Sequence, residues 1–312
     1  MKAKRSGLTL VEILVVVGVI AILAGMLLPA VSMVRKTARE AKQRVQFTAI
    51  DLALATFKND HGDYPPSDRY SWLADTQQTE NSSGAQKLAE ALLGWDLLGF
   101  HPDSGWRADG TNRWPYRVGT TTHAAGTYFL YDRTVEHDMD KRRSRYLDID
   151  TSNAVRLGIT GAYDGLFNLG AVGGPLASAA QTFVLGDAFG KGKEVVLPDG
   201  TRRRAGLPVL YYRANSSARM REDVYDSRDN DNLVYAKEQT DLAQRGTPPV
   251  RATGAHWNPL AGTVATFYDY ITDWRASTTA FHVPHKPDSY ILISAGNDGF
   301  YGTDDDICNF SR

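Results

Sequence analysis

The fold of this chain is decided by residues 7–34, GLTLVEILVVVGVIAILAGMLLPAVSMV, in which Glu12 is the only charged residue. The run is longer than the roughly 20 apolar residues that a helix needs to cross a bilayer. A carboxylate inside such a helix costs a few kcal/mol, so it usually marks a function. The stretch therefore predicts a membrane-spanning helix in which Glu12 does more than support the fold.

The helical pattern continues beyond the apolar run. Leu8 to about Asn59 reads as one helix of about 80 Å, at 1.5 Å per residue. Pro29 lies inside its apolar half and is expected to kink or loosen it. The second half carries an apolar stripe at helical spacing, which we expect to dock on a globular domain. The residues of that stripe are Phe47, Ile50, Leu54 and Phe57.

The remainder of the chain mixes helix, strand and long loops. Residues 85–98 have leucines on one side of a helix, and residues 183–185, 207–213 and 289–294 have the apolar character of strands. Glycine-rich and polar stretches between these segments indicate loops. The sequence thus predicts an α+β fold, with a long N-terminal helix packed on a C-terminal antiparallel β-sheet that carries large loop insertions.

Composition limits the classes of function. The chain has 312 residues and a net charge of −1, so charge gives no indication of nucleic-acid binding. Cys308 is the single cysteine, which excludes an intrachain disulfide framework. Basic residues lie on both sides of the apolar run, so the positive-inside tendency does not decide its orientation. An ordinary signal anchor remains an alternative for this segment.

A second informative segment lies near the C-terminus. Four carboxylates occur at Asp298, Asp304, Asp305 and Asp306, with glycines between them. Calcium is bound by six to eight oxygen ligands that mix carboxylates with backbone carbonyls. The spacing does not match the EF-hand loop, and a solvated acidic turn is the alternative interpretation.

The N-terminus resembles those of type IV pilins and of the pseudopilins of type II secretion. The shared pattern is a short basic leader that ends in glycine (Gly7), a large apolar first residue of the mature chain (Leu8, where the family usually has Phe) and a glutamate fifth (Glu12). The resemblance implies that a prepilin peptidase cleaves after Gly7 and methylates the new amine of Leu8. It also implies that Glu12 pairs with the first amine of a neighbouring subunit during filament assembly.

Two further segments resemble the major pseudopilin. Residues 183–213 resemble its Asp-Pro-Trp-Gly-x-Pro-Tyr-x-Tyr hairpin, although a polar insert at 191–206 interrupts the match. The acidic segment resembles its calcium loop. That likeness implies calcium bound by the side chains of Asp298, Asp304 and Asp306 and by the carbonyls of Ala295 and Phe300, with Asp305 pointing away.

The resemblance implies four regions: a leader (1–7), a transmembrane half-helix (8–34), an amphipathic half-helix (35–61) and an extracytoplasmic domain (62–312). It implies a non-catalytic, single-pass inner-membrane protein whose C-terminal domain lies in the periplasm. The protein would assemble with copies of itself and with other pseudopilins, through an assembly platform and its ATPase, into a filament for protein secretion. A pilus subunit for adhesion or DNA uptake, and a membrane-anchored enzyme or glycan-binding domain, are the alternatives.

Overall fold

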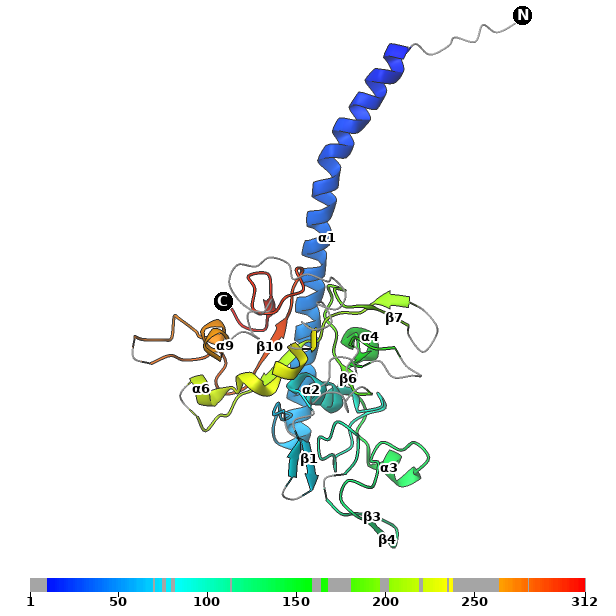
Figure 1. The fold of residues 1–312 in the computed structure, drawn as a ribbon, viewed down its shortest axis with the longest axis vertical. Helices are drawn as coiled ribbons and strands as arrows, with labels where there is room; N and C mark the ends of the chain where they lie inside the picture. Colours follow the sequence, from blue (N-terminus) through cyan, green and yellow to red (C-terminus); the bar gives the residue numbers. More distant parts are fainter. Residues whose placement is uncertain are drawn as a thin grey trace, which may run out of the picture.

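A computed structural model describes residues 10–69, 71–74, 77–79, 82–112, 114–158, 164–167, 181–196, 202–218, 221–234, 236–237, 264–279 and 281–311. Helix α1 (Leu10–His61) extends away from a domain built of short strands and helices (Figure 1). This arrangement confirms the predicted α+β class. Cleavage and methylation were predicted at Gly7 and Leu8, which lie outside the described residues.

Helix α1 is continuous over 52 residues, with Pro29 inside it. Its apolar half is long and hydrophobic enough to cross a membrane, and that half makes no buried contact with the domain. Figure 1 shows a gentle bend in this half and no break. Proline lacks an amide hydrogen, which loosens the helix locally. The hydroxyl of Ser32 donates to the Pro29 carbonyl at 2.8 Å, in the turn that follows.

The other elements are short. Those before residue 160 are β1 (Ser71–Ala74), β2 (Gln77–Thr79), α2 (Gly84–Leu93), β3 (Tyr116–Val118), β4 (Thr121–His123), α3 (Glu136–Lys141), α4 (Ile149–Ser152) and β5 (Val155–Arg156). Those after it are β6 (Phe183–Val184), β7 (Glu194–Val196), β8 (Arg202–Arg204), β9 (Leu210–Arg213), α6 (Arg221–Val224), the 3-10 turn η2 (Ser227–Asp229), α9 (Val264–Ile271), β10 (Tyr290–Ser294) and β11 (Ile307–Cys308).

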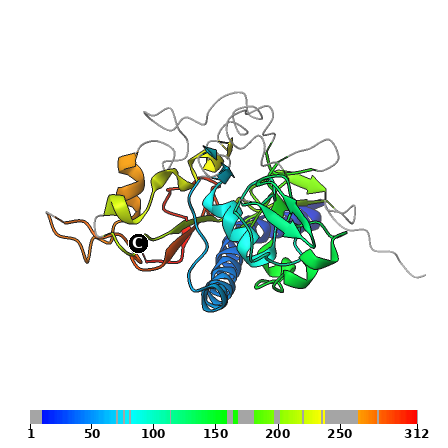
Figure 2. The ribbon, with the colours of Figure 1, turned by 90° about the horizontal axis from the view of Figure 1, so that it is seen from below.

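The centre of the domain is a three-stranded antiparallel sheet in the order β11-β10-β9. Strand β10 is buried along its whole length, and its side chains alternate between two hydrophobic clusters. Tyr290 and Leu292 join the cluster that contains α1 and α2. Ile291 and Ile293 join the cluster that contains α9. Consequently α1 covers one face of the sheet and α9 lies beyond the other (Figure 2).

The amphipathic stripe of α1 docks as predicted. Its four apolar residues are at most 4% exposed, and they pack against α2 and the sheet. Burying a large apolar side chain contributes about 1.5–3 kcal/mol. The stripe therefore makes the lower half of α1 part of the domain core.

Two buried amides fix the height at which α1 enters the domain. The Gln46 side-chain amide donates to the carbonyls of Gly186 (2.9 Å) and Ser152 (3.2 Å). The Gln43 side-chain oxygen accepts from the Ala188 amide at 2.7 Å. Buried polar groups must be hydrogen-bonded, so sliding α1 by one turn would leave several of these groups without partners.

Helix α2 is shorter than predicted. Ser83 caps its N-terminus, and the helix ends at Leu93 because Gly94 takes a positive φ of 84°. The prediction that this helix reaches Leu98 is therefore wrong, and Leu97 lies beyond it with a φ of 65°. Leucines continue at helical spacing beyond Gly94, so the spacing alone does not show that the helix ends at this glycine.

The predicted hairpin at 183–213 has a different pairing. Strand β6 pairs with β5, and β9 pairs with β10. The expected hairpin contact is kept only by an isolated bridge between Gly186, which follows β6, and Pro208, which precedes β9. The polar insert forms its own hairpin, β7–β8, and residues 197–201 between these strands lie outside the described residues.

Asp187 lies at the centre of this junction and is 2% exposed. Its carboxylate accepts from the amides of Phe189 (3.0 Å) and Leu207 (3.2 Å) and from the Ser294 hydroxyl (3.2 Å). Burial raises its pKa to about 7, although these hydrogen bonds lower it in part. Asp187 therefore links the Gly186–Ala188 turn, which contacts α1, to the end of β10.

The raised pKa makes a prediction about Asp187→Asn. Between about pH 4 and pH 7 the folded protein keeps a proton that the unfolded chain loses, so Asp187 reduces stability as the pH rises through this range. An asparagine keeps the acceptor oxygen and does not ionise. We expect the melting temperature of the variant, relative to wild type, to rise by several degrees from about pH 4 to about pH 8. Thermal unfolding of the whole chain in detergent measures this difference.

The exposed Asp140→Asn variant, which removes one carboxylate from the surface, is the control for the change in net charge. A constant difference between Asp187→Asn and wild type across the range would contradict a neutral buried carboxyl.

Candidate assembly segment and acidic loop

Glu12 lies in the first turn of α1 and is exposed on its apolar half. A carboxylate near a helix N-terminus is favoured by the helix dipole. In hydrocarbon its attraction to a cation is much stronger than in water, provided that the partner arrives with suitable geometry. The position therefore suits Glu12 to a strong contact with a cationic group inside the membrane.

The acidic loop connects β10 to β11, between Ser294 and Ile307. Gly296 has a φ of 63°, and a Cβ there would lie 2.3 Å from the Asp305 carbonyl oxygen. A larger residue would clash with this backbone and would be strained. The loop is thus a tightly closed turn attached to the buried central strand.

Asp305 and Asp306 hold the loop together. One Asp305 oxygen accepts from the amides of Asn297 (2.8 Å) and Asp298 (2.9 Å), and the other accepts from the Thr303 hydroxyl (2.9 Å). Burial acts to raise the pKa of Asp305, but these hydrogen bonds outweigh it and lower the pKa. The Asp305 side chain thus turns toward the amides of the loop, and its expected orientation away from a calcium ion stays a prediction.

Asp306 is nearly buried and accepts from the Gly302 amide and the Tyr270 hydroxyl, both at 2.6 Å. Tyr270 comes from α9, and its hydroxyl also lies 3.2 Å from the Cys308 sulfur. Burial raises the pKa of Tyr270, so this phenol stays protonated and donates. Sequence reasoning missed this contact, because no pattern around residue 270 indicates that α9 packs beside the loop.

Three of the four remaining predicted ligands have partners within the loop. Asp298 accepts from the Phe300 amide at 2.8 Å, and burial raises its pKa. Asp304 is exposed. The Ala295 carbonyl accepts from the Gly299 amide (3.1 Å), and the Phe300 carbonyl lies 3.2 Å from the Thr303 hydroxyl, whose single hydrogen it shares with Asp305.

These oxygens are chemically suited to calcium, but all except those of the exposed Asp304 face hydrogen-bond donors of the loop or of α9. Among the residues described, no three His, Cys, Asp or Glu side chains converge on a point where a metal ion could lie. In this arrangement the loop does not fit the ion, and calcium binding stays a prediction of the sequence.

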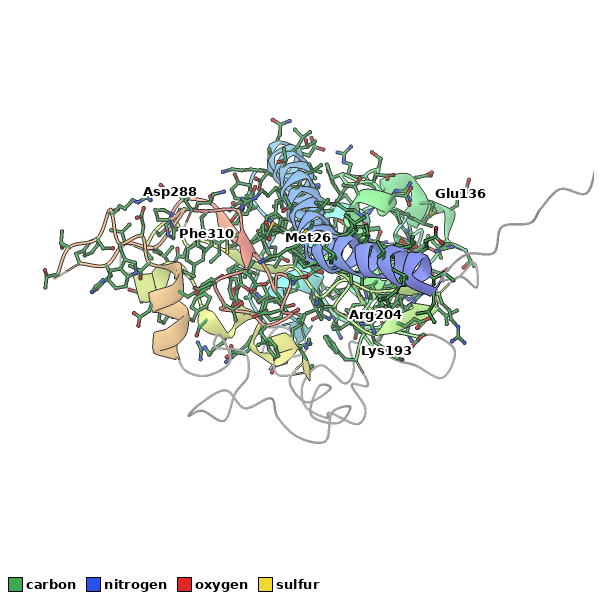
Figure 3. The ribbon with its side chains drawn as sticks, turned by 90° about the horizontal axis from the view of Figure 1, so that it is seen from above. Met26, Glu136, Lys193, Arg204, Asp288 and Phe310 are labelled. Atoms are coloured by element: carbon green, nitrogen blue, oxygen red, sulfur yellow. The ribbon has the colours of Figure 1, made fainter. Side chains whose placement is uncertain are left out.

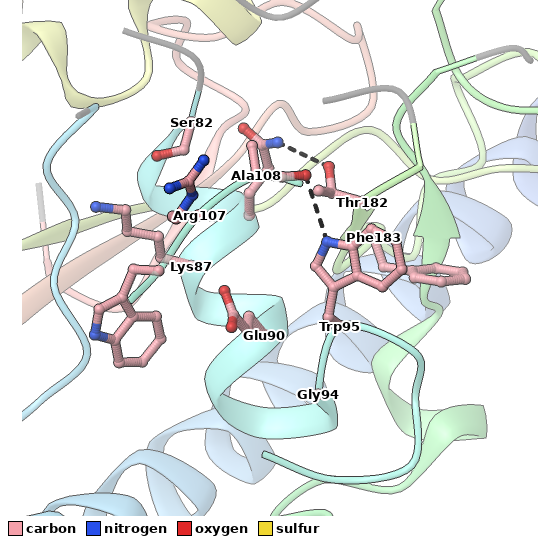
Figure 4. A pocket seen from close by; sticks show the side chains of 11 residues that line it. Ser82, Lys87, Glu90, Gly94, Trp95, Arg107, Ala108, Thr182 and Phe183 are labelled. Carbon is pink, nitrogen blue, oxygen red and sulfur yellow. Dashed lines mark hydrogen bonds between the residues drawn. The ribbon is translucent and has the colours of Figure 1, made fainter. Parts of the chain in front are cut away.

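A small cavity of about 10 Å³ lies beside α2 (Figure 4). It is lined by buried Lys87, Glu90 and Arg107, with Trp95 nearby. The Lys87 ammonium lies 3.0 Å from Asp68, while burial lowers the pKa of Lys87 and raises that of Glu90. A space of this size holds about one water molecule.

Comparison with known proteins identifies the N-terminal segment. Residues 2–28 match the family model of the prokaryotic N-terminal methylation motif. No curated protein and no solved structure matches the chain. The protein therefore carries a prepilin-type, type IV pilin-like N-terminus, and the motif implies processing by a prepilin peptidase and pilin assembly. The match covers the leader and most of the apolar half-helix.

Calcium binding can be tested by thermal unfolding of the whole chain. If the loop rearranges around the ion, calcium at about 100 times its Kd should stabilise the protein by about 2.7 kcal/mol, and a chelator should remove the effect. Replacing Asp298 and Asp304 with Asn should abolish the response, whereas Asp140→Asn should keep it. Identical melting curves in calcium and in chelator would show that the loop holds no calcium.

Proposed function

We propose that the protein is a structural subunit of a type II secretion pseudopilus. The observation that carries the proposal is one uninterrupted helix with two environments. Its first half is apolar and carries the part of the methylation motif from Leu10 onward, whereas its second half is part of the domain core. Such a helix can anchor a folded domain in a membrane and can later place that domain on the outside of a helical bundle.

The apolar half needs a second partner once a subunit leaves the lipid. Its large apolar side chains, from Leu10 to Val34, are mostly more than half exposed on the isolated chain. Packing against the same segment of neighbouring subunits would cover them. Two small residues on this half, Gly18 and Gly25, face open space: a Cβ added at either would meet no heavy atom within 4 Å, so another helix can approach closely there.

Glu12 supplies the specific contact in this proposal. After cleavage behind Gly7, the amine of Leu8 is a cation near the start of the same helix. Pairing of Glu12 with that amine on a neighbouring subunit would neutralise both charges in low dielectric. The pair would also fix the axial offset between subunits, because Glu12 has a defined place on α1 and Leu8 precedes it by four residues in the sequence.

Two features of the sequence support a secretion pseudopilus over a surface pilus: the likeness of the acidic loop to the major pseudopilin, and the presence of a single cysteine. In this role the subunit is held by the inner membrane with residues 62–312 in the periplasm. An assembly platform and its cytoplasmic ATPase would then add it to copies of itself and to other pseudopilins. A filament that extends beyond the outer membrane would favour the pilus instead.

Replacing Glu12 with leucine tests the assembly role. We expect the variant to insert in the membrane as well as wild type, because leucine is more favourable in lipid than a carboxylate. Without the charge pair, filament assembly should fall at least about tenfold, which corresponds to about 1.4 kcal/mol. Quantitative blotting of membranes and of sheared filaments measures the two steps separately.

The matched control is Glu40→Leu, which removes a glutamate from the same helix outside the apolar half. It should assemble normally. Wild-type amounts of filament from the Glu12 variant would refute the proposed pairing.

A further inference from the structure

We call residues 35–44 of α1 the neck. The neck follows the apolar half and overlaps the start of the docking face, whose first buried residue is Gln43. It contains five basic residues and one acidic residue, Glu40. All five basic side chains are exposed; they are Arg35, Lys36, Arg39, Lys42 and Arg44. Within the described chain, the ion pair that these residues form joins Lys36 to Glu40 at 3.8 Å.

Helical spacing gathers three of these cations on one face. Arg35, Arg39 and Lys42 follow one another at intervals of four and three. The buried Gln46 comes four residues after Lys42, so the same face docks on the domain one turn further toward the C-terminus of α1. The cations therefore occupy the space between the domain and the bilayer on the side of α1 that the domain covers.

The neck is longer than the lipid headgroup layer is thick, so it can reach from the edge of the hydrocarbon through the headgroups. Eight residues, 35–42, rise about 12 Å along the helix. The headgroup layer of each leaflet is about 5–7 Å thick, and the Debye length at physiological salt is about 8 Å. With Val34 at the edge of the hydrocarbon, the neck cations lie in the headgroups or within about one Debye length of them.

A second basic element lies at the rim of the domain, where Figure 3 views the molecule from the side of the apolar half and labels Lys193 and Arg204. Two of its cations have acidic neighbours: Lys193 lies 2.7 Å from Asp164, and Arg204 is the cross-strand neighbour of Glu194. The neck differs from this element because it follows the apolar half directly on α1.

We infer that the neck of α1 binds anionic phospholipid headgroups through Arg35, Arg39 and Lys42. Basic residues beside a membrane span attract anionic lipid by about 1 kcal/mol each. Zwitterionic lipid offers no such net attraction. Bound headgroups would hold the domain at a fixed height relative to the bilayer while the subunit waits for assembly. This inference rests on membrane insertion of α1 and does not depend on which filament the subunit joins.

Selectivity for spin-labelled lipids tests the inference on the full chain. The protein is reconstituted in phosphatidylcholine vesicles that contain a trace of spin-labelled phosphatidylglycerol or phosphatidylcholine, and the fraction of label immobilised by the protein is measured. We expect wild type to prefer phosphatidylglycerol. In the triple variant Arg35→Gln, Arg39→Gln, Lys42→Gln, the preference for phosphatidylglycerol over phosphatidylcholine should be at least about threefold lower than in wild type. About 1 M salt, where the Debye length is about 3 Å, should reduce the wild-type preference to that of the variant.

The matched control replaces three basic residues of the domain that lie far from the membrane span, Arg117, Arg133 and Arg145, with Gln. It should keep the wild-type preference. An unchanged preference in the neck variant would overturn the inference and assign the selectivity to Lys2, Lys4 and Arg5 at the other end of the span. Unchanged lipid selectivity with a loss of filament assembly or of DNA binding would also overturn it, since the neck would then serve another partner.

Discussion

The structure depends on the burial of the lower half of α1 against the central sheet. Phe47, Ile50, Leu54 and Phe57 place the second half of a helix whose first half is apolar in the core of the domain. The helix is continuous, so any force on its apolar half is transmitted directly to the domain. The amides of Gln43 and Gln46 add specificity, because they allow one height and one rotation of the helix relative to the Gly186–Ala188 turn. Apolar packing alone would tolerate small slips that these hydrogen bonds do not.

Charge along α1 changes with the surroundings of each segment. Glu12 is the one charged residue of the apolar half, a cluster of cations follows at the neck, and uncharged amides occur where the domain begins. Each change suits a different dielectric environment: hydrocarbon, headgroups and protein interior. The acidic loop at the end of β10 is a separate device. Its carboxylates Asp305 and Asp306 close the loop through amide and hydroxyl donors, and Tyr270 links it to α9.

The features that could be predicted from the sequence are those with a local signature. The apolar run, the stripe of α1 and the methylation motif depend on neighbouring residues alone, and the fold class followed from them. The partners of the strands could not be predicted in the same way, because pairing depends on contacts between distant residues. Thus β6 pairs with β5 instead of closing the expected hairpin, and α2 ends at Gly94 although leucines continue beyond it. The donors that Asp305 faces could not be predicted for a similar reason, because composition shows that a carboxylate is present but does not show which amides surround it.

The central claim is that α1 is a processed, assembly-competent prepilin-type helix, and the intact mass of the protein purified from its native membrane tests it most directly. We predict a chain that begins at Leu8 and carries one added methyl group, so the mass should equal that of residues 8–312 plus this group. A chain that retains residues 1–7 with an unmodified amine would contradict the claim. The apolar half-helix would then be an ordinary anchor, and the proposed pairing of Glu12 with a neighbour's first amine would be impossible.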